Sequence, residues 1–138
     1  MTDPDTEATR IEPLLNVSDI RASVRFYVDG LGFRIVNRWE VSGELRWARM
    51  EYGDAALMIQ QLPIQGADAW RPVGAVGQGI TLCLMCTDAR RVYHSVIDRG
   101  LQPRPPYVGN GLWVTSLTDP DGYRLDFESP ADSTTSST

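Results

Sequence analysis

Apolar positions along the chain follow two spacings, one typical of strands and one typical of helices. Residues 11–17 form a short apolar run that predicts a strand, and apolar side chains from Ile20 to Leu31 recur at intervals of three and four, which predicts a helix. Gly32 ends this helix where a left-handed residue is favoured. Further strands are predicted, on either side of a Gly-Asp turn, at residues 33–39, 45–52 and 57–60.

The same order recurs in the second half of the chain. Residues 80–86 predict a strand, residues 89–97 a helix, and Gly100 ends that helix. Strands are then predicted at residues 101–104, 112–118 and 125–128. Two similar halves tend to pair about a pseudo-twofold axis. The sequence therefore predicts an α+β fold of two βαβββ modules in pseudo-twofold repeat, with mixed sheets that curl around a shared cavity.

Both predicted helices begin with the same residue types. Ser18 and Thr87 are N-cap residues by type. Asp19 and Asp88 follow them and put negative charge in the first turn, where the helix dipole favours it. Matching caps and matching helical spacing make an internal repeat a better explanation than chance similarity between short amphipathic segments.

Composition sets the expected domain limits. The segment between the two halves contains Pro and Gly without a clear period, which indicates a linker, and both ends of the chain are polar with little to bury. The expected parts are a disordered tail at residues 1–10, a module at 11–61, the linker at 62–79, a module at 80–129 and a second disordered tail at 130–138, so that a single domain spans 11–129.

Charge and hydropathy argue against several classes of protein. The chain has 13 Arg, no Lys and 18 acidic residues, for a net charge of -5, which is a poor match to nucleic acid. Without Lys, a Schiff-base enzyme and a Walker-type phosphate loop are excluded. No apolar run approaches the ~20 residues of a membrane span, and the polar N-terminus does not resemble a signal peptide. We expect a cytoplasmic protein with neither a nucleic-acid nor a membrane partner.

The cysteines and the only histidine offer little chemistry. Cys83 and Cys86 have the spacing of half a zinc site, but the chain has no second pair. In a strand their side chains point to opposite faces, so we expect two small buried hydrophobic residues. His94 falls in the middle of the second helix and is expected to be solvated.

Several motifs resemble one known family. Residues 17–21, Phe26-Tyr27, the Gly-Leu-Gly-Phe sequence at 30–33 and the segment 119–128 together resemble the vicinal oxygen chelate superfamily. This superfamily includes glyoxalase I, extradiol dioxygenases and bleomycin-resistance proteins. The use of Arg as the only cation indicates a high-GC genome, from which we expect a bacterial protein. The resemblance covers residues 11–128 and implies the two-module fold together with a homodimer that completes its cavities across a twofold interface.

The resemblance also implies positions for metal ligands, one on each first strand and each last strand. These positions are Glu12, Met58, Thr81 and Asp126, and the internal repeat aligns the same pairs. Thr81 is a poor ligand and Met58 is a soft thioether, so the four-ligand site of glyoxalase I is incomplete. One histidine does not supply the two that an extradiol dioxygenase needs. We therefore expect no cofactor, with a weakly held divalent metal as the alternative.

Glu12 and Asp126 are the candidate catalytic residues, and three interpretations stay open. With a divalent metal they suit a lyase, an isomerase or a transferase. Facing each other across an apolar cavity, one carboxyl would have a raised pKa, which suits a metal-independent epimerase or cyclase. Alternatively, each carboxylate pairs with an arginine such as Arg49 or Arg124.

Aromatic side chains indicate a ligand. The four tryptophans and Tyr107 fall in strands and loops outside the predicted helix cores, where flat rings suit a planar compound. Trp47 and Arg49 share one face of a predicted strand and would bind an anionic aromatic compound, with residues 103–111 as a lid. The favoured function is binding of a small aromatic or natural-product molecule without an intact metal site. The candidate contacts are Asn16, Trp47, Arg49, Met58, Gln60, Thr81, Cys83, Trp113 and Glu128.

Overall fold

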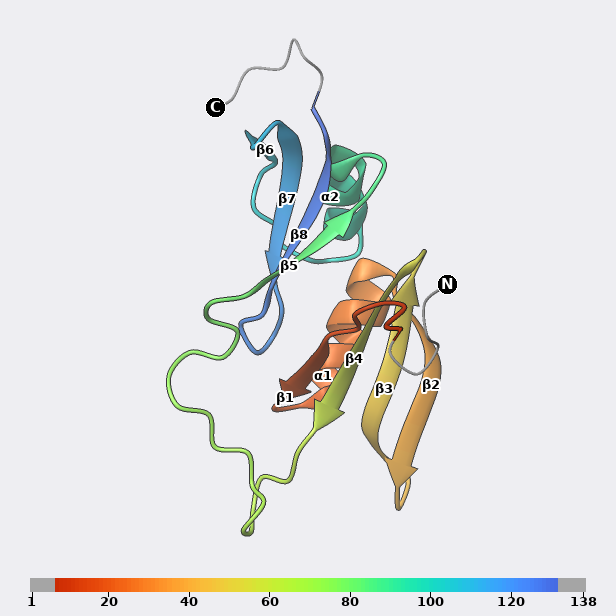
Figure 1. Ribbon diagram of the computed structural model, residues 1–138, viewed down its shortest axis with the longest axis vertical. Coiled ribbons are helices and arrows are strands. Elements are labelled where there is room, and N and C mark those ends of the chain that lie inside the picture. The colour runs from red at the N-terminus through yellow and green to blue at the C-terminus, as the bar shows by residue number, and fades with distance from the viewer. Residues whose placement is uncertain (1–6, 132–138) are drawn as a thin grey trace.

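Two four-stranded mixed sheets, one from each half of the chain, build the protein (Figure 1). The structure is a computed structural model and describes residues 7–131. Residues 1–6 and 132–138, most of the two expected tails, lie outside the described residues. The strand orders are β1-β4-β3-β2 and β5-β8-β7-β6, with one parallel pair in each sheet. The two predicted βαβββ modules are therefore present, and neither sheet closes into a barrel.

The first module has six elements. They are β1 (Leu14–Val17), α1 (Ile20–Val24), a π-helix η2 (Arg25–Leu31), β2 (Arg34–Val41), β3 (Glu44–Tyr52) and β4 (Ala55–Gln61). The π-helix continues α1 directly and ends at Gly32, whose φ of 93° is left-handed as predicted. We call the sheet of this module sheet A.

The second module has five elements, and its sheet is called sheet B. They are β5 (Thr81–Met85), α2 (Ala89–Asp98), β6 (Tyr107–Gly109), β7 (Leu112–Thr118) and β8 (Arg124–Pro130). The strand predicted at 101–104 is absent, because the prolines that follow it lack the N–H donors that a ladder needs. A turn with positive φ at Asn110 and Gly111 instead pairs β6 with β7, so the expected lid contains a strand.

The N-cap of each helix lies one residue later than predicted. Asp19 is the N-cap of α1, and its side chain accepts hydrogen bonds from the backbone N–H of Arg21 and Ala22. Asp88 caps α2 in the same way. The backbone at both Asp residues is still extended, which is the conformation of a cap and not of a first helical turn. The acidic residues therefore serve as caps in place of Ser18 and Thr87.

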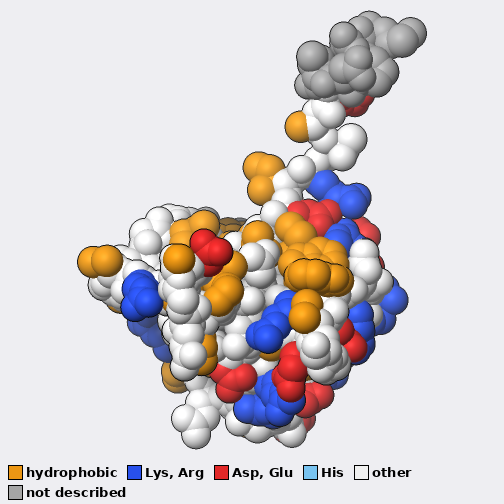
Figure 2. Space-filling view, turned by 90° about the horizontal axis from the view of Figure 1, so that it is seen from below, with side chains coloured by type: hydrophobic (Ala, Val, Ile, Leu, Met, Phe, Trp, Pro, Cys, Tyr) orange, Lys and Arg blue, Asp and Glu red, His pale blue; other side chains and the backbone are white. Residues whose placement is uncertain are grey.

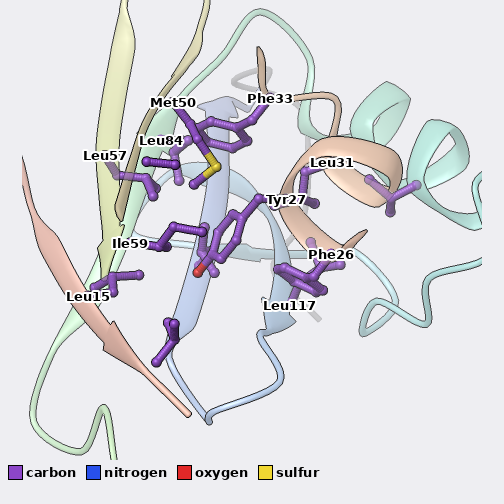
Figure 3. Packing of buried hydrophobic residues seen from close by; sticks show 14 of the residues in the cluster. Leu15, Phe26, Tyr27, Leu31, Phe33, Met50, Leu57, Ile59, Leu84 and Leu117 are labelled. Carbon is purple, nitrogen blue, oxygen red and sulfur yellow. The ribbon is translucent and has the colours of Figure 1, made fainter. Parts of the chain in front are cut away.

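One continuous hydrophobic core joins the two modules (Figure 3). The predicted alternation of strand faces is confirmed, since Leu57, Ile59, Leu125 and Phe127 are all buried. Tyr27 from the π-helix lies between the sheets with no exposed surface. Residues with the opposite parity therefore face away from this core, and they form the open face of each sheet.

A buried carboxylate fastens the second module to the first. The hydroxyl of Tyr27 donates to Asp119 Oδ2 at 2.8 Å, and Asp119 Oδ1 accepts from the backbone N–H of Asp121 and Tyr123 at 2.9 Å. The Tyr123 hydroxyl donates to the carbonyl of Asn16. Burial raises the pKa of Asp119 above its ordinary value despite these donors. The turn before β8 is thus held against the start of the chain.

The described helices are all short. Within residues 7–131, none is long and apolar enough to cross a membrane.

Candidate functional site

The open face of sheet A carries a row of side chains that includes two indoles. Trp39 on β2 lies directly opposite Trp47 on β3, and Trp47 lies opposite Gln60 on β4. Gln60 in turn lies opposite Asn16 on β1. Cross-strand partners on one face have Cβ atoms about 5 Å apart, so this register places the two indoles side by side.

A groove of about 980 Å³ runs along this row. Its lining includes Trp39 and Trp47 together with the linker residues Leu62, Pro63 and Ile64. The groove is open to solvent, since the side chains of Trp39 and Ile64 are 61% and 70% exposed. Figure 2 views the molecule from the end that carries the linker, and there exposed hydrophobic side chains gather with arginine and acidic side chains between them.

Glu12 is neutralised by an arginine. Arg49 donates from Nε to Glu12 Oε1 at 2.6 Å and from Nη2 to Oε2 at 3.0 Å, and Arg10 adds a further ion pair. These contacts, with that of Arg49 as the largest cause, lower the pKa of Glu12 to about 2. A carboxylate so acidic is a poor proton donor at neutral pH, which argues against the acid-base interpretation. Arg49 also donates to Glu51 at 2.8 Å, so its charge is already matched.

Asp126 is paired in a similar way. It is 7% exposed on the open face of sheet B and accepts from Arg124 Nε at 2.9 Å. The Ser116 hydroxyl donates to the same Oδ1 atom at 2.7 Å, and Arg124 also donates to the hydroxyl of Tyr107. Both candidate catalytic carboxylates therefore have arginine partners, which is the third of the interpretations that the sequence left open.

The low pKa of Glu12 predicts a specific pH dependence of stability. Its folded-state pKa is about 2 against an ordinary 4.5, so the stabilisation is complete above pH 4.5 and is lost as the pH falls toward 2. Urea unfolding of the wild type and of Glu12→Gln is expected to give free energies that differ at pH 6 and converge below pH 3. Glu44→Gln, at an exposed pair with Arg21, is the control for removing one acidic charge. A difference that stays constant with pH would contradict the role of Glu12.

The remaining candidates divide between the two sheets. Met58 and Gln60 lie on the open face of sheet A, as Trp47 does. On sheet B, Cys83 lies opposite Asp126, with Thr81 and Glu128 on the same face by strand alternation. The sequence-predicted contacts therefore form two groups, one on each sheet. Among these predicted contacts, Trp47 and Gln60 line the groove.

Three of the predicted residues have surroundings that differ from the expected ones. Trp113 points to the helix-covered face of sheet B, where the guanidinium of Arg90 lies 4.7 Å from its ring centre. Its neighbour of the same parity, Thr115, bonds to the carbonyl of Ala89. Cys83 is exposed and not buried, because it lies on the open face of an edge strand. The guanidinium of Arg49 pairs with Glu12 and Glu51, in addition to lying on the same face as Trp47.

The four family-equivalent positions do not fit a resident divalent metal. Glu12 and Asp126 would each have to give up an arginine, and Met58 and Thr81 add a thioether and a hydroxyl, which hard cations bind poorly. Across residues 7–131, no three His, Cys, Asp or Glu side chains lie together in a way that would hold a metal ion.

Sequence reasoning missed part of the groove. Trp39 belongs to the lining because the Ser42-Gly43 turn, with positive φ at both residues, sets it opposite Trp47. That turn was a usable signal. No sequence signal pointed to Arg46 or to the linker residues of the groove. A segment without hydrophobic periodicity does not predict where its side chains lie in the fold.

The comparisons with known proteins agree with this fold. The family model of the Glyoxalase/Bleomycin resistance protein/Dioxygenase superfamily matches residues 10–127. The protein belongs to this superfamily. Among curated proteins, a lactoylglutathione lyase of Haemophilus influenzae is 26% identical over 123 residues, which cover 85% of this chain and 89% of that protein.

Solved structures show the same architecture at low identity. An antibiotic binding protein from Streptomyces sp. CB03234, TnmS3, has a TM-score of 0.63 at 18% identity and covers 91% of this chain and 99% of its own. A bleomycin resistance determinant encoded on transposon Tn5 has a TM-score of 0.67 at 22% identity, with 89% and 98% covered. At these identities the likeness establishes the fold and not the ligand.

Proposed function

We propose that this protein binds a small aromatic or natural-product molecule in the groove between sheet A and the linker, without a metal ion. The observation that carries the proposal is the pair of adjacent indoles, Trp39 and Trp47, in a groove that apolar linker residues also line. Trp39 is exposed and Trp47 is half-buried, and covering such ring surface with a flat ligand lowers the free energy of the complex. The groove volume of about 980 Å³ is within the range of small-molecule sites.

Two further observations support the proposal. The arginine partners of Glu12 and Asp126 neutralise the carboxylates that a metal-dependent reaction would use. Two proteins of similar fold are described as an antibiotic binding protein and a bleomycin resistance determinant. The same architecture therefore supports binding of natural products elsewhere in the superfamily.

A ligand screen with matched tryptophan variants tests the proposal. We expect saturable quenching of tryptophan fluorescence by members of an aromatic natural-product library, unchanged by EDTA. Trp47→Ala should weaken each such ligand about tenfold or more, because stacked aromatic contacts contribute roughly 1–3 kcal/mol. Trp113→Phe, on the far face of the other sheet, is the control and should leave affinity unchanged. Equal weakening by both variants would exclude the groove as the site, and loss of binding in EDTA would exclude binding without a metal ion.

The alternative is a divalent-metal-dependent lyase, isomerase or transferase that uses Glu12 and Asp126. The similarity to a lactoylglutathione lyase favours it. Equilibrium dialysis against Mn²⁺, Ni²⁺, Zn²⁺, Fe²⁺ and Mg²⁺ separates the two candidates. One ion per chain, lost in Asp126→Ala, would support the enzyme, whereas the binding function predicts no stoichiometric ion.

We also propose that the domain spans residues 11–129 and pairs as a homodimer. Apolar side chains on the open faces support this, since Leu14 on sheet A is 47% exposed and Met85 on sheet B is 65% exposed. Sedimentation equilibrium should give twice the chain mass of 15.4 kDa. A cytoplasmic location suits the free thiols of Cys83 and Cys86.

A further inference from the structure

We infer that the ligand of the groove is a planar aromatic compound that carries an anionic group, and that Arg46 holds this group. The inference rests on the proposed function and goes further by naming the chemical class of the ligand. It depends on three features of the groove, namely an arginine without an ion pair, a lining of aromatic and aliphatic side chains, and an amide whose acceptor end is occupied.

The first feature is the charge of Arg46, which lines the groove. Among residues 7–131, Arg46 makes no ion pair within 4.0 Å, although three acidic residues lie on the same hairpin; one of them, Glu51, pairs with Arg34 and Arg49. Glu44 is paired with Arg21 at 3.2 Å, and Glu40 with Arg38 at 3.6 Å. The local carboxylates are therefore satisfied elsewhere, which leaves the guanidinium of Arg46 to an incoming anion.

The second feature is the apolar lining of the groove. Trp39 and Trp47 line the groove and are held side by side by the register of β2 and β3. The apolar start of the linker, Leu62 to Ile64, lines it as well. A backbone hydrogen bond from Trp70 N–H to the Pro63 carbonyl at 2.8 Å closes the linker into a loop and fixes this part of the lining. Aromatic rings next to aliphatic side chains favour a flat ligand, because a flat ligand can contact both kinds of surface.

The third feature is the orientation of a groove amide. Gln61 Oε1 accepts from the backbone N–H of Ile20 at 2.9 Å, so the acceptor end of this side chain is occupied. Its Nε2 amino group, a donor only, remains for a ligand. Arg46 likewise only donates, and its planar fork matches the oxygens of a carboxylate or sulfonate. Among the described residues, Arg46 is the one charged side chain in the lining of the groove, and its fixed positive charge favours an oxygen-rich anion over a cation.

Three pyrene compounds with the same ring test this inference. They are 1-pyrenecarboxylate, the neutral 1-pyrenecarboxamide and the cationic 1-pyrenylmethylammonium, and equilibrium dialysis measures the Kd of each. We expect the carboxylate to bind at least about tenfold more tightly than the amide, because a charge-assisted hydrogen bond is roughly twice as strong as a neutral one and 1.4 kcal/mol is tenfold. The ammonium should bind most weakly.

Matched arginine variants assign the preference to one residue. Arg46→Gln is expected to abolish the advantage of the carboxylate while the Kd of the amide stays within about twofold. Arg25→Gln removes the same charge from an exposed position on the π-helix and should leave all three constants unchanged. Trp39→Ala should weaken all three compounds by a similar factor, which places them in the groove.

The outcomes separate the two proposals. If all three compounds bind with similar Kd values, or if Arg46→Gln keeps the preference for the carboxylate, the inference about the anion is wrong and the groove still binds aromatic molecules. If no compound binds and the aromatic library also gives no ligand, both proposals fail together. Equal loss of the carboxylate preference in Arg25→Gln would mean a general charge effect and would also overturn the inference.

Discussion

Replacing Phe127 by alanine is expected to lower the free energy of unfolding by about 3–5 kcal/mol, the usual cost of removing a buried phenyl ring. Phe127 has no exposed surface, and its ring lies 5.8 Å from that of Tyr52 in the other module. The substitution would therefore open a cavity where the two halves of the core meet. Urea unfolding followed by circular dichroism measures the change.

Two controls accompany this substitution. Phe127→Leu keeps most of the volume and should cost less than Phe127→Ala, which also covers the case in which the alanine variant does not fold. Val73→Ala, at a linker position with a fully exposed side chain, should change stability by less than about 0.5 kcal/mol. A cost below about 1 kcal/mol for Phe127→Ala would mean that the two modules do not share a core in solution.

The second large effect is expected at Asp119. Asp119→Ala removes the only acceptor of the buried Tyr27 hydroxyl among the described contacts, together with the acceptor of two turn N–H groups. Since each buried group left without a partner costs about 1–3 kcal/mol, we expect a loss of about 2–4 kcal/mol in thermal or urea unfolding. Asp68→Ala, at an exposed linker position, is the control.

A double-mutant cycle attributes the effect to the hydrogen bond. Tyr27→Phe removes the hydroxyl while keeping the ring, and the double variant with Asp119→Ala should cost less than the sum of the two single changes. Additive costs would show that Tyr27 and Asp119 act independently. The pKa of Asp119 is higher in the folded protein than in the unfolded chain. Its contribution to the free energy of unfolding therefore falls as the pH rises from the unfolded-state pKa to the folded-state pKa. Asp119→Asn should lack this dependence.

The sequence predicted most of the fold because the fold depends on local signals. Strand alternation at 57–60 and 125–128 identified the buried faces correctly, and Gly32 marked the end of the first helix. The prediction was wrong for a strand whose position depends on tertiary contacts. The short strand β6 lies at residues 107–109 and not at 101–104, because three prolines precede Tyr107. The hydrophobic periodicity did not indicate this position.

The candidate site was harder to predict because it depends on which groups pair in space. Pairing of Glu12 and Asp126 with arginines was one of three interpretations that the sequence left open. Only the distances in the structure select this interpretation. Sequence spacing placed Arg49 on the same face as Trp47, whereas its ion pairs with Glu12 and Glu51 depend on contacts that the spacing does not reveal. Asp119 looked like an ordinary turn residue, because its partner Tyr27 is 92 residues away.

The two faces of sheet A divide the protein between folding and recognition. Residues of one parity, such as Met50 and Ile59, are fully buried, while those of the other, such as Trp47 and Gln60, line the groove. Substitutions on opposite faces of one strand share few contacts, so their free energies should be nearly additive. Natural selection or a directed-evolution library can then change the chemistry of the groove residue by residue without destabilising the core. A duplicated scaffold of this kind can therefore change its ligand while it keeps its architecture.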